Sequence, residues 1–272
     1  MTSDFLSIIV EHKKKEIKKA KKHVSESTLA KTAALPRDKR PFFKKMASPG
    51  SSGINIIAEI KRASPSKGII CDNLNPTAMA KQYENGGASA LSVLTDKRYF
   101  SGTIKDLQQA REATGLPVLR KDFLISSYQI YESASAGADA VLLIVRILSQ
   151  KQLKDYMQLC EELGLDVLVE VHSIKDINTA VAAKAKLVGI NNRNLSSFDT
   201  DTHNAIELVS LLSPDQVPVA ASGIATKKDI DMNVAAGINN FLIGESLVRA
   251  KDPAAFIASL LRPGEGYIYG RL

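Results

Sequence analysis

The segment IIAEIKRASPSKG (Ile56 to Gly68) places two opposite charges, Glu59 and Lys61, at the end of an apolar run. Side chains alternate along a strand, so Ile57 shares one face with both charges and the intervening apolar residues share the other. A run that is apolar on both faces is typical of a buried parallel strand, where an unpaired charge costs on the order of several kcal/mol. We therefore expect both charges at the open mouth of a site. The alternative is an ordinary charge pair at a surface strand end.

The length and composition favour one globular protein with a large core. The chain has 272 residues, of which 44% are hydrophobic and 24% charged, and a (β/α)8 barrel needs about 250 residues. The two cysteines, Cys71 and Cys160, lack the spacing of a disulfide framework or of a zinc site. This cysteine usage favours a reducing cytoplasm.

The net charge of +7 comes entirely from the amino-terminal segment. Residues 1–50 contain 13 Lys and Arg against 5 Asp and Glu, whereas the remainder contains 23 against 24. We interpret the densest stretch, HKKKEIKKAKK (12–22), as the solvated face of a docked helix. A nucleic-acid-binding arm is the alternative, but no aromatic residues are interleaved with the lysines. We therefore expect no nucleic-acid partner and assign residues 1–50 to a helical extension packed on the rest.

Neither secretion nor membrane insertion is expected. The apolar stretch FLSIIV (5–10) is too short for the core of a signal peptide, and the lysine cluster follows it rather than preceding it. No stretch approaches the roughly 20 apolar residues that a membrane span requires. We predict a cytoplasmic protein without a membrane partner.

From residue 54 onward, apolar runs alternate with helical patterns. The expected strands cover residues 54–60, 89–94, 117–120, 139–145, 166–170, 187–191, 217–221 and 240–244, and the expected helices begin near residues 76, 103, 127, 149, 174, 202, 226 and 252. Eight strand–helix units specify a closed parallel barrel more economically than an open sheet. The predicted fold class is therefore α/β, a (β/α)8 TIM barrel over residues 51–272, forming a single domain with the amino-terminal extension.

Barrel enzymes carry their chemistry at the carboxyl ends of the strands. The residues expected there include Glu59, Lys61, Tyr99, Phe100, Arg120, Lys121, Phe123, Glu170, Asn191, Arg193, Ser222, Gly223, Gly244 and Glu245. Satisfied charges are common at buried strand ends, so no single residue in this set is decisive. Their convergence on one rim indicates an active site.

Two glycine-containing loops, ASGI (221–224) and IGES (243–246), follow the last two expected strands. Barrels often bind a phosphate at this place, with backbone amides of the loops as donors. Neither loop has the pattern of a Walker or dinucleotide-binding motif, so ATP and NAD are not indicated. The alternative is that these glycines only permit tight turns.

Taken together, the motifs resemble those of the indole-3-glycerol phosphate synthase family of tryptophan biosynthesis. The matching segments are IAEIKRASPSKG (57–68), LTDKRYFSG (94–102), VLRKDF (118–123), VLLIVRIL (141–148), LVEVH (168–172), GINNRNL (189–195), SGI (222–224) and FLIGESL (241–247). The likeness covers essentially the whole chain, and the first segment is highly specific.

The resemblance implies a role for each matching residue. Lys121 is the general acid at the substrate's ketone, and Glu170 is a general acid/base in ring closure and dehydration. Lys61 and Glu59 assist catalysis and orient the substrate, and Asn191 lines the polar side. The implied substrate-binding residues are Phe100, Phe123, Leu142 and Ile144 around the aromatic ring, Arg193 at the carboxylate, and Ser64, Ser222, Gly223, Gly244 and the backbone amide of Glu245 around the phosphate.

The implied reaction is the decarboxylating, dehydrating ring closure of 1-(2-carboxyphenylamino)-1-deoxyribulose 5-phosphate to indole-3-glycerol phosphate. Carbon attack on a ketone needs a proton donor at the oxygen. Among apolar walls and near a second lysine, we expect a lowered pKa for Lys121, which would make it a stronger acid. The resemblance implies no metal and no organic cofactor, a small phosphorylated substrate as the partner, and a monomer or weak homodimer.

One position departs from the family pattern. The family usually has a Glu directly before the Ser-Gly of the seventh strand, whereas this chain has Ala221. A carboxylate that helps to hold the substrate is therefore absent. We expect the activity to be reduced but present.

Two other functions are weaker candidates. A phosphoribosyl isomerase would need a Cys and an Asp at strand ends, but Cys71 falls in an expected loop and the first strand ends in Glu59 and Lys61. A degenerate barrel could instead bind nucleic acid through its lysine-rich amino terminus. Removing residues 1–22 would then abolish RNA binding, whereas it would change the substrate affinity if the helix is docked beside a site.

Overall fold

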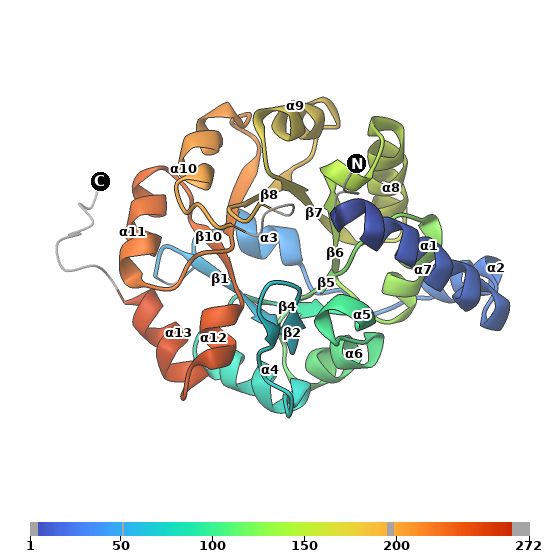
Figure 1. Ribbon diagram of the computed structural model, residues 1–272, viewed down its shortest axis with the longest axis horizontal. Coiled ribbons are helices and arrows are strands. Elements are labelled where there is room, and N and C mark those ends of the chain that lie inside the picture. Colours follow the sequence, from blue (N-terminus) through green and yellow to red (C-terminus); the bar gives the residue numbers. More distant parts are fainter. Residues whose placement is uncertain (1–4, 51, 195–198, 263–272) are drawn as a thin grey trace.

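The computed structural model describes residues 5–50, 52–194 and 199–262, and its main sheet is a closed barrel of parallel strands surrounded by helices (Figure 1). The strands are β1 (Asn55–Ile60), β4 (Ala90–Leu94), β5 (Val118–Lys121), β6 (Ala140–Ile144), β7 (Asp166–Val171), β8 (Leu187–Asn191), β9 (Val217–Ala221) and β10 (Asn240–Ile243). Each strand pairs with its neighbours in the sequence, and β10 closes the barrel on β1. The predicted (β/α)8 fold is confirmed, and the bounds of every expected strand differ from the observed ones by at most one residue.

A helix follows each barrel strand, and together these helices form the outer layer. They are α4 (Pro76–Asn85), α6 (Ile104–Ala113), α7 (Ser127–Ser135), α8 (Gln150–Glu162), α9 (Ile174–Ala182), α10 (Asn204–Leu208), α11 (Lys227–Ala235) and α13 (Pro253–Leu261). Ser149 and Thr226 begin α8 and α11 with capping boxes, in which side chain and backbone satisfy each other's donors. The helix starts are therefore encoded locally, as the sequence predicts.

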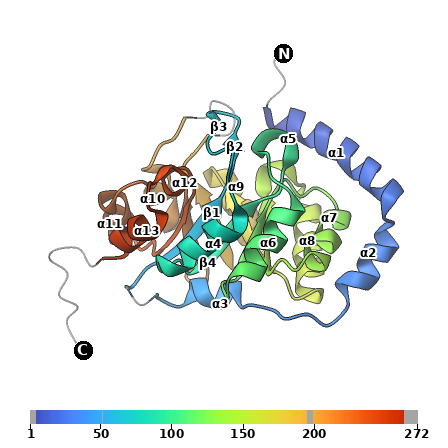
Figure 2. The ribbon, with the colours of Figure 1, turned by 90° about the horizontal axis from the view of Figure 1, so that it is seen from below.

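Several short elements between the barrel strands and their outer helices, or after a helix, are not predicted from the sequence. They are the hairpin β2 (Ala63–Ser64) and β3 (Gly68–Ile69), the helices α5 (Lys97–Phe100) and α12 (Glu245–Arg249), and the 3-10 turns η1 (Val145–Ile147) and η2 (Val209–Leu211). The hairpin occupies the RASPSKG segment that follows β1. In Figure 2 the hairpin and α5 lie together at the upper edge of the molecule.

The alternation predicted for β1 is present. Ile57 belongs to the apolar cluster inside the barrel, whereas Ile56 and Ala58 belong to the cluster between the barrel and its outer helices. Glu59 is on the inner side, and only 5% of its surface is exposed. The strand thus directs its charged end into the barrel mouth.

The opposite end of the barrel is closed by α3 (Phe42–Ala47), a helix that the sequence does not predict. Phe42 and Met46 are buried in the same inner cluster as Ile57 and Leu119. The Phe43 amide donates to Asp166 at the start of β7, at 2.7 Å. Figure 2 shows α3 at the lower edge, away from the hairpin.

The amino-terminal helices α1 (Phe5–His23) and α2 (Glu26–Ala33) run along the outside of the barrel. Ser127 and Ser135 of α7 donate to Glu26 and to the Leu29 carbonyl, which ties α2 to that helix. Beyond α2, Arg37 donates to the carbonyls of Ala138, Leu163 and Gly164 on the loops below α7 and α8.

Two predictions fall partly on positions outside the described residues. These are the domain boundary at residue 51 and Leu195, the last residue of a family motif. Within the described parts of the chain, no helix is long and apolar enough to cross a membrane.

Candidate active site

A cavity of about 340 Å³ opens at the carboxyl ends of the strands. The predicted site residues that line it are Glu59, Lys61, Ser64, Phe100, Lys121, Phe123, Asn191, Arg193, Ser222, Gly223, Gly244 and Glu245. The other three, Glu170, Leu142 and Ile144, are buried and do not line it. The structure thus brings residues from distant parts of the sequence to one cavity.

Glu59 and Lys61 form an ion pair at one side of the cavity, with 2.7 Å between Oε1 and Nζ. Both side chains are largely buried, with 7% and 13% of their surface exposed. Gly244 packs against this pair so closely that a Cβ there would overlap Glu59 Oε1 and lie 3.0 Å from Lys61 Nζ. A glycine at the end of β10 is therefore required for the pair to keep its place.

Lys121 and Glu170 form a second ion pair, with 3.3 Å between Nζ and Oε2. They come from the carboxyl ends of β5 and β7, two strands separated in the barrel by β6. Lys121 lines the cavity, and Glu170 lies behind it with only 3% of its surface exposed. Glu170 is therefore connected to the cavity through the lysine with which it pairs.

The two charges hold each other in the ionised form. Burial lowers the pKa of Lys121, but the negative charges of Glu170 and Glu59 outweigh it, and the pKa is raised above its ordinary value. Burial raises the pKa of Glu170, but Lys121, His172 and a hydrogen bond from Asn191 outweigh it, and the pKa is lowered. The expectation of a lowered pKa for Lys121 was wrong, because a sequence does not show which carboxylates lie beside a lysine.

His172 lies behind Glu170 and was not identified as a site residue from the sequence. Its Nε2 is 3.5 Å from Glu170 Oε1, and within the described residues neither ring nitrogen has a hydrogen-bond partner. Burial lowers the pKa of His172 more than the charge of Glu170 raises it. The imidazole is therefore neutral at neutral pH, and the charge of Glu170 is balanced mainly by Lys121.

One end of the cavity is basic and rich in hydroxyl groups. Arg193 donates to Ser66 Oγ at 2.9 Å and lies 3.9 Å from the Glu245 carboxylate, which also accepts from Arg249 at 3.1 Å. Ser64 Oγ is buried and has no hydrogen-bond partner among the described residues. A buried hydroxyl without a partner, on a cavity that an arginine also lines, is suited to an anionic ligand.

The other end is apolar and includes a wall that the sequence did not predict. The rings of Phe100 and Phe123 lie 6.1 Å apart, and both belong to or pack against the inner apolar cluster that contains Leu142 and Ile144. Phe5, Leu6 and Ile9 of α1 complete this side of the cavity. The cavity therefore has an apolar part and a part lined by basic and hydroxyl groups.

Comparisons with known proteins bear on this arrangement. The family model for indole-3-glycerol phosphate synthase matches residues 6–260. The chain is 55% identical over 260 residues to the indole-3-glycerol phosphate synthase of Desulfosudis oleivorans, covering 95% of this chain and 99% of that protein. It is 50% identical over 258 residues to the synthase of Syntrophobacter fumaroxidans, covering 95% and 97%. This chain belongs to the indole-3-glycerol phosphate synthase family.

Solved structures support the fold at much lower sequence identity. The 3-hexulose-6-phosphate synthase from Salmonella typhimurium superposes with a TM-score of 0.61 at 11% identity, covering 76% of this chain and 97% of that chain. The thiamine phosphate pyrophosphorylase from Pyrococcus furiosus gives 0.58 at 13% identity, covering 76% and 93%. The indole-3-glycerol phosphate synthase family thus shares its barrel architecture with these proteins.

Ala221, the position where the resemblance leads us to expect a Glu, is the last residue of β9 and lines the cavity. It lies opposite Asn191 of β8 and Leu242 of β10 in the strand register. A carboxylate at this position would therefore enter the cavity beside Asn191. Among residues 5–50, 52–194 and 199–262, no three His, Cys, Asp or Glu side chains are grouped as a metal site requires.

Proposed function

We propose that this chain performs the indole-3-glycerol phosphate synthase reaction with Lys121 as the proton donor to the ketone and Glu170 as the general acid/base. The ring carbon that bears the substrate's carboxylate attacks the ketone carbon, and the ketone oxygen takes a proton. The carboxylate leaves as CO2, and the electron pair of the broken bond restores the aromatic ring. The new hydroxyl then leaves as water, and the neighbouring carbon loses a proton to a base.

The observation that carries this proposal is the Lys121–Glu170 ion pair, 3.3 Å long, at the wall of a cavity with one apolar and one basic end. The raised pKa of Lys121 keeps its ammonium group formed at neutral pH, so that it can donate a proton. The lowered pKa of Glu170 keeps it ionised, so that it can accept one. Two groups with such different environments can divide the proton transfers between them.

The second ion pair has a supporting role in the proposal. Glu59 and Lys61 lie on the same cavity and orient the substrate carboxylate and hydroxyls, together with Asn191 and Arg193. Holding a flexible open-chain substrate so that its ring carbon meets the ketone can supply a large part of the rate enhancement.

The two ends of the cavity bind the two ends of the substrate. Phe100 and Phe123 contact the aromatic ring, and Leu142 and Ile144 support them from below. The phosphate lies among Ser64, Ser222, Gly223 and Gly244, with Glu245 contributing its backbone amide. The Glu245 carboxylate does not face the phosphate in this proposal, because Arg249 and Arg193 hold it.

The test uses the purified chain, the carboxyphenylamino-deoxyribulose phosphate substrate and the fluorescence of the indole product. Lys121→Met and Glu170→Gln should each lower kcat by about 10²- to 10⁴-fold, the usual contribution of a positioned acid or base. Lys151→Met is the matched control, because that side chain is 84% exposed and does not line the cavity. Product formation at equal rates by the wild type and Lys121→Met would remove Lys121 from its role.

Three broader features belong to the same proposal. The free thiols of Cys71 and Cys160 support a reducing compartment, the cytoplasm. The extension and the barrel form one domain, supported by the buried contacts of Leu6 and Ile9. The protein is a monomer or a weak homodimer without a nucleic-acid partner, and sedimentation over a range of concentrations tests the oligomeric state.

A further inference from the structure

One lysine of the basic helix α1 is not solvated. Lys13 is only 4% exposed, whereas the side chain of its neighbour Lys14 is 60% exposed. The Lys13 ammonium lies 2.7 Å from Asp96 Oδ2 and 2.9 Å from Asp122 Oδ1. The interpretation of the lysine cluster as a solvated face therefore fails at this position.

Each of the two carboxylates lies next to cavity residues in the sequence. Asp96 is fully buried and begins α5 by accepting from the Tyr99 amide at 2.6 Å, and Phe100 follows directly. Asp122 stands between Lys121 and Phe123, and accepts from the Phe123 amide at 2.8 Å. Lys13 thus bridges two separate segments that carry the apolar end of the cavity and the proposed acid.

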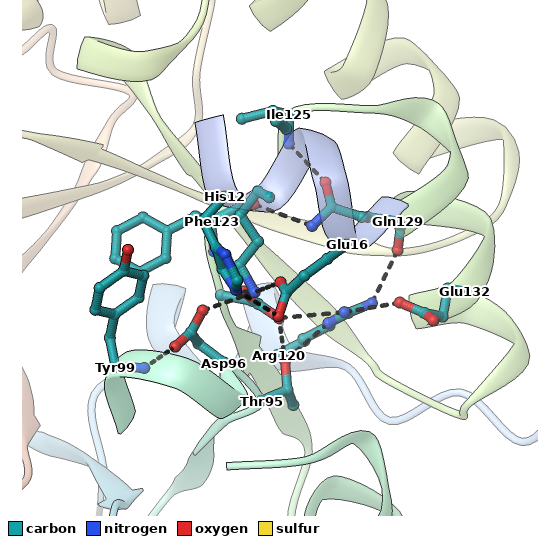
Figure 3. A network of polar contacts seen from close by, with 12 residues as sticks. His12, Glu16, Thr95, Asp96, Tyr99, Arg120, Phe123, Ile125, Gln129 and Glu132 are labelled. Carbon is teal, nitrogen blue, oxygen red and sulfur yellow. Dashed lines mark hydrogen bonds and ion pairs between the residues drawn. The ribbon is translucent and has the colours of Figure 1, made fainter. Parts of the chain in front are cut away.

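A network behind the carboxylates fixes them on the barrel. Asp122 Oδ2 accepts from Thr95 at 2.6 Å and from Arg120 at 3.2 Å. Arg120 in turn pairs with Glu132 of α7 at 2.8 Å. Figure 3 shows Arg120 reaching from Thr95 toward Glu132, with Asp96 and Tyr99 to one side. The barrel side of the contact is therefore rigid, and α1 is the element that Lys13 attaches to it.

Lys13 and Asp122 both stay charged at neutral pH. Burial raises the pKa of Asp122, but the charges of Lys13 and Arg120 outweigh it and lower the pKa to about 2. Burial lowers the pKa of Lys13, but the two carboxylates outweigh it and raise the pKa. Removing the ammonium would leave Asp122 with Arg120 alone and would take from Asp96 the ion pair it makes among the described residues, which is costly for a buried carboxylate and displaces the groups around it.

The residues of α1 on the same face as Lys13 reach into the cavity. Ile9 precedes Lys13 by one helical turn, is 1% exposed, and lines the cavity together with Leu6 and Phe5. The position of this wall relative to Phe100 and Phe123 therefore depends on the contact that Lys13 makes.

We infer that Lys13 is a positioning residue for the synthase reaction, which holds the α1 wall against the segments of Phe100 and Phe123 and so shapes the subsite for the substrate's aromatic ring. The inference rests on the proposed function, because it assumes that the apolar end of the cavity takes the ring. It assigns no contact between Lys13 and the substrate.

The experiment compares Lys13→Met with Lys14→Met, a matched change one residue along the same helix. Lys13→Met should raise the KM of the substrate by about tenfold or more and lower kcat by a smaller factor, because displaced ring-binding walls weaken positioning. The inhibition constant of inorganic phosphate should stay unchanged, because the anion-binding end lies on other loops. Lys14→Met should match the wild type in every measurement.

Two further variants keep the test decisive if Lys13→Met folds poorly. Lys13→Gln retains a hydrogen-bond donor, and Asp96→Asn retains a good helix cap for α5 while removing the charge. Both should raise KM, and the double variant Lys13→Gln/Asp96→Asn should raise it by less than the product of the two single effects.

The outcomes distinguish a role of Lys13 in shaping the ring subsite from a role in protein stability alone. A lower melting temperature with KM within twofold of the wild type would overturn the inference, as would an equal weakening of phosphate inhibition. An active wild type with fully active Lys13 variants would contradict this inference alone. A wild type that forms no indole product would contradict the proposed function and the inference with it.

Discussion

The two ends of the barrel interior use the same inward-facing positions in opposite ways. At the amino end, Phe42 and Met46 fill the space, and the buried Asn55 amide donates to Asn240 at 2.9 Å and to the Ser48 carbonyl at 2.8 Å. At the carboxyl end, the interior holds ion pairs beside an open cavity. The buried amides of Asn55 and Asn240 at the amino end are satisfied by fixed neutral partners, whereas the charged side chains at the carboxyl end pair with each other beside a cavity that can admit a ligand. The amino end of the barrel interior thus contributes mainly to stability, and the carboxyl end holds the groups suited to chemistry.

The largest effect on stability should come from the amino end. Phe42→Ala removes a fully buried ring from α3, the helix that closes the amino end of the barrel. It should lower the free energy of unfolding by about 3–5 kcal/mol. The folded variant should keep its kcat and KM, because the ring lies at the far end from the cavity lining. Urea unfolding and the indole assay measure the two quantities.

Phe43→Ala is the control for this prediction, because Phe43 lies in the same helix but is only partly buried. Its replacement should lower the free energy of unfolding by less than that of Phe42. A large loss of kcat in folded Phe42→Ala, at a temperature where the wild type is stable, would show that the two ends are not separate.

At the carboxyl end, Glu170→Gln should change the titration of Lys121. The neighbouring carboxylate is the largest of the effects that raise the pKa of Lys121, and burial alone lowers it. Removing the charge should therefore move the pKa down, and the neutral amine should form at lower pH. The rate at which an amine-specific reagent labels Lys121, followed by mass spectrometry against pH, reports this change.

The labelling of Lys151, an exposed lysine, serves as the internal control and should not shift. If the labelling profile of Lys121 were the same in the wild type and in Glu170→Gln, the two groups would not be coupled as the 3.3 Å distance indicates.

The smallest effect is expected from Ala221→Glu, which adds a charge to the carboxyl end of the barrel. Ala221→Glu should raise kcat/KM by a few-fold, because a carboxylate there can help to hold the substrate hydroxyls. The side chain in Ala221→Gln is about as large as that in Ala221→Glu but carries no charge, so this variant should show a smaller increase in kcat/KM. Unchanged rate and affinity in Ala221→Glu would mean that a neighbouring group already supplies this contact.

The sequence predicted the barrel well because its signals are local. The apolar runs, the capping residues Ser149 and Thr226, and the left-handed glycines that end helices, such as Gly137 with φ of 86°, each act within a few residues. The alternation at Ile57 and Glu59 likewise follows from strand geometry alone. The candidate site could then be assembled because all parallel strand ends meet on one rim.

What the sequence did not reveal depends on contacts between distant segments. Lys13 looks like its neighbours in HKKKEIKKAKK, and only the fold places it on Asp96 and Asp122. The pKa of Lys121 was predicted in the wrong direction for the same reason, since Glu170 lies on a different strand. Helix α3 has six residues and follows Pro41, so its sequence carries only a weak helical pattern. Its position is set instead by tertiary packing, in which Phe42 is fully buried.

The packing of residues 5–50 against the barrel has a consequence for folding during synthesis. Arg37 donates to the carbonyls of Ala138, Leu163 and Gly164, and Phe42 belongs to the inner apolar cluster, to which all eight barrel strands up to Leu242 of β10 contribute. These segments are synthesised before the barrel strands against which they pack, and Leu242 of β10 is the last of those partners to be made. Until β10 has emerged, the nascent chain carries Phe42 and Met46 without a barrel to cover them, which is the interval in which we expect chaperones to be needed most.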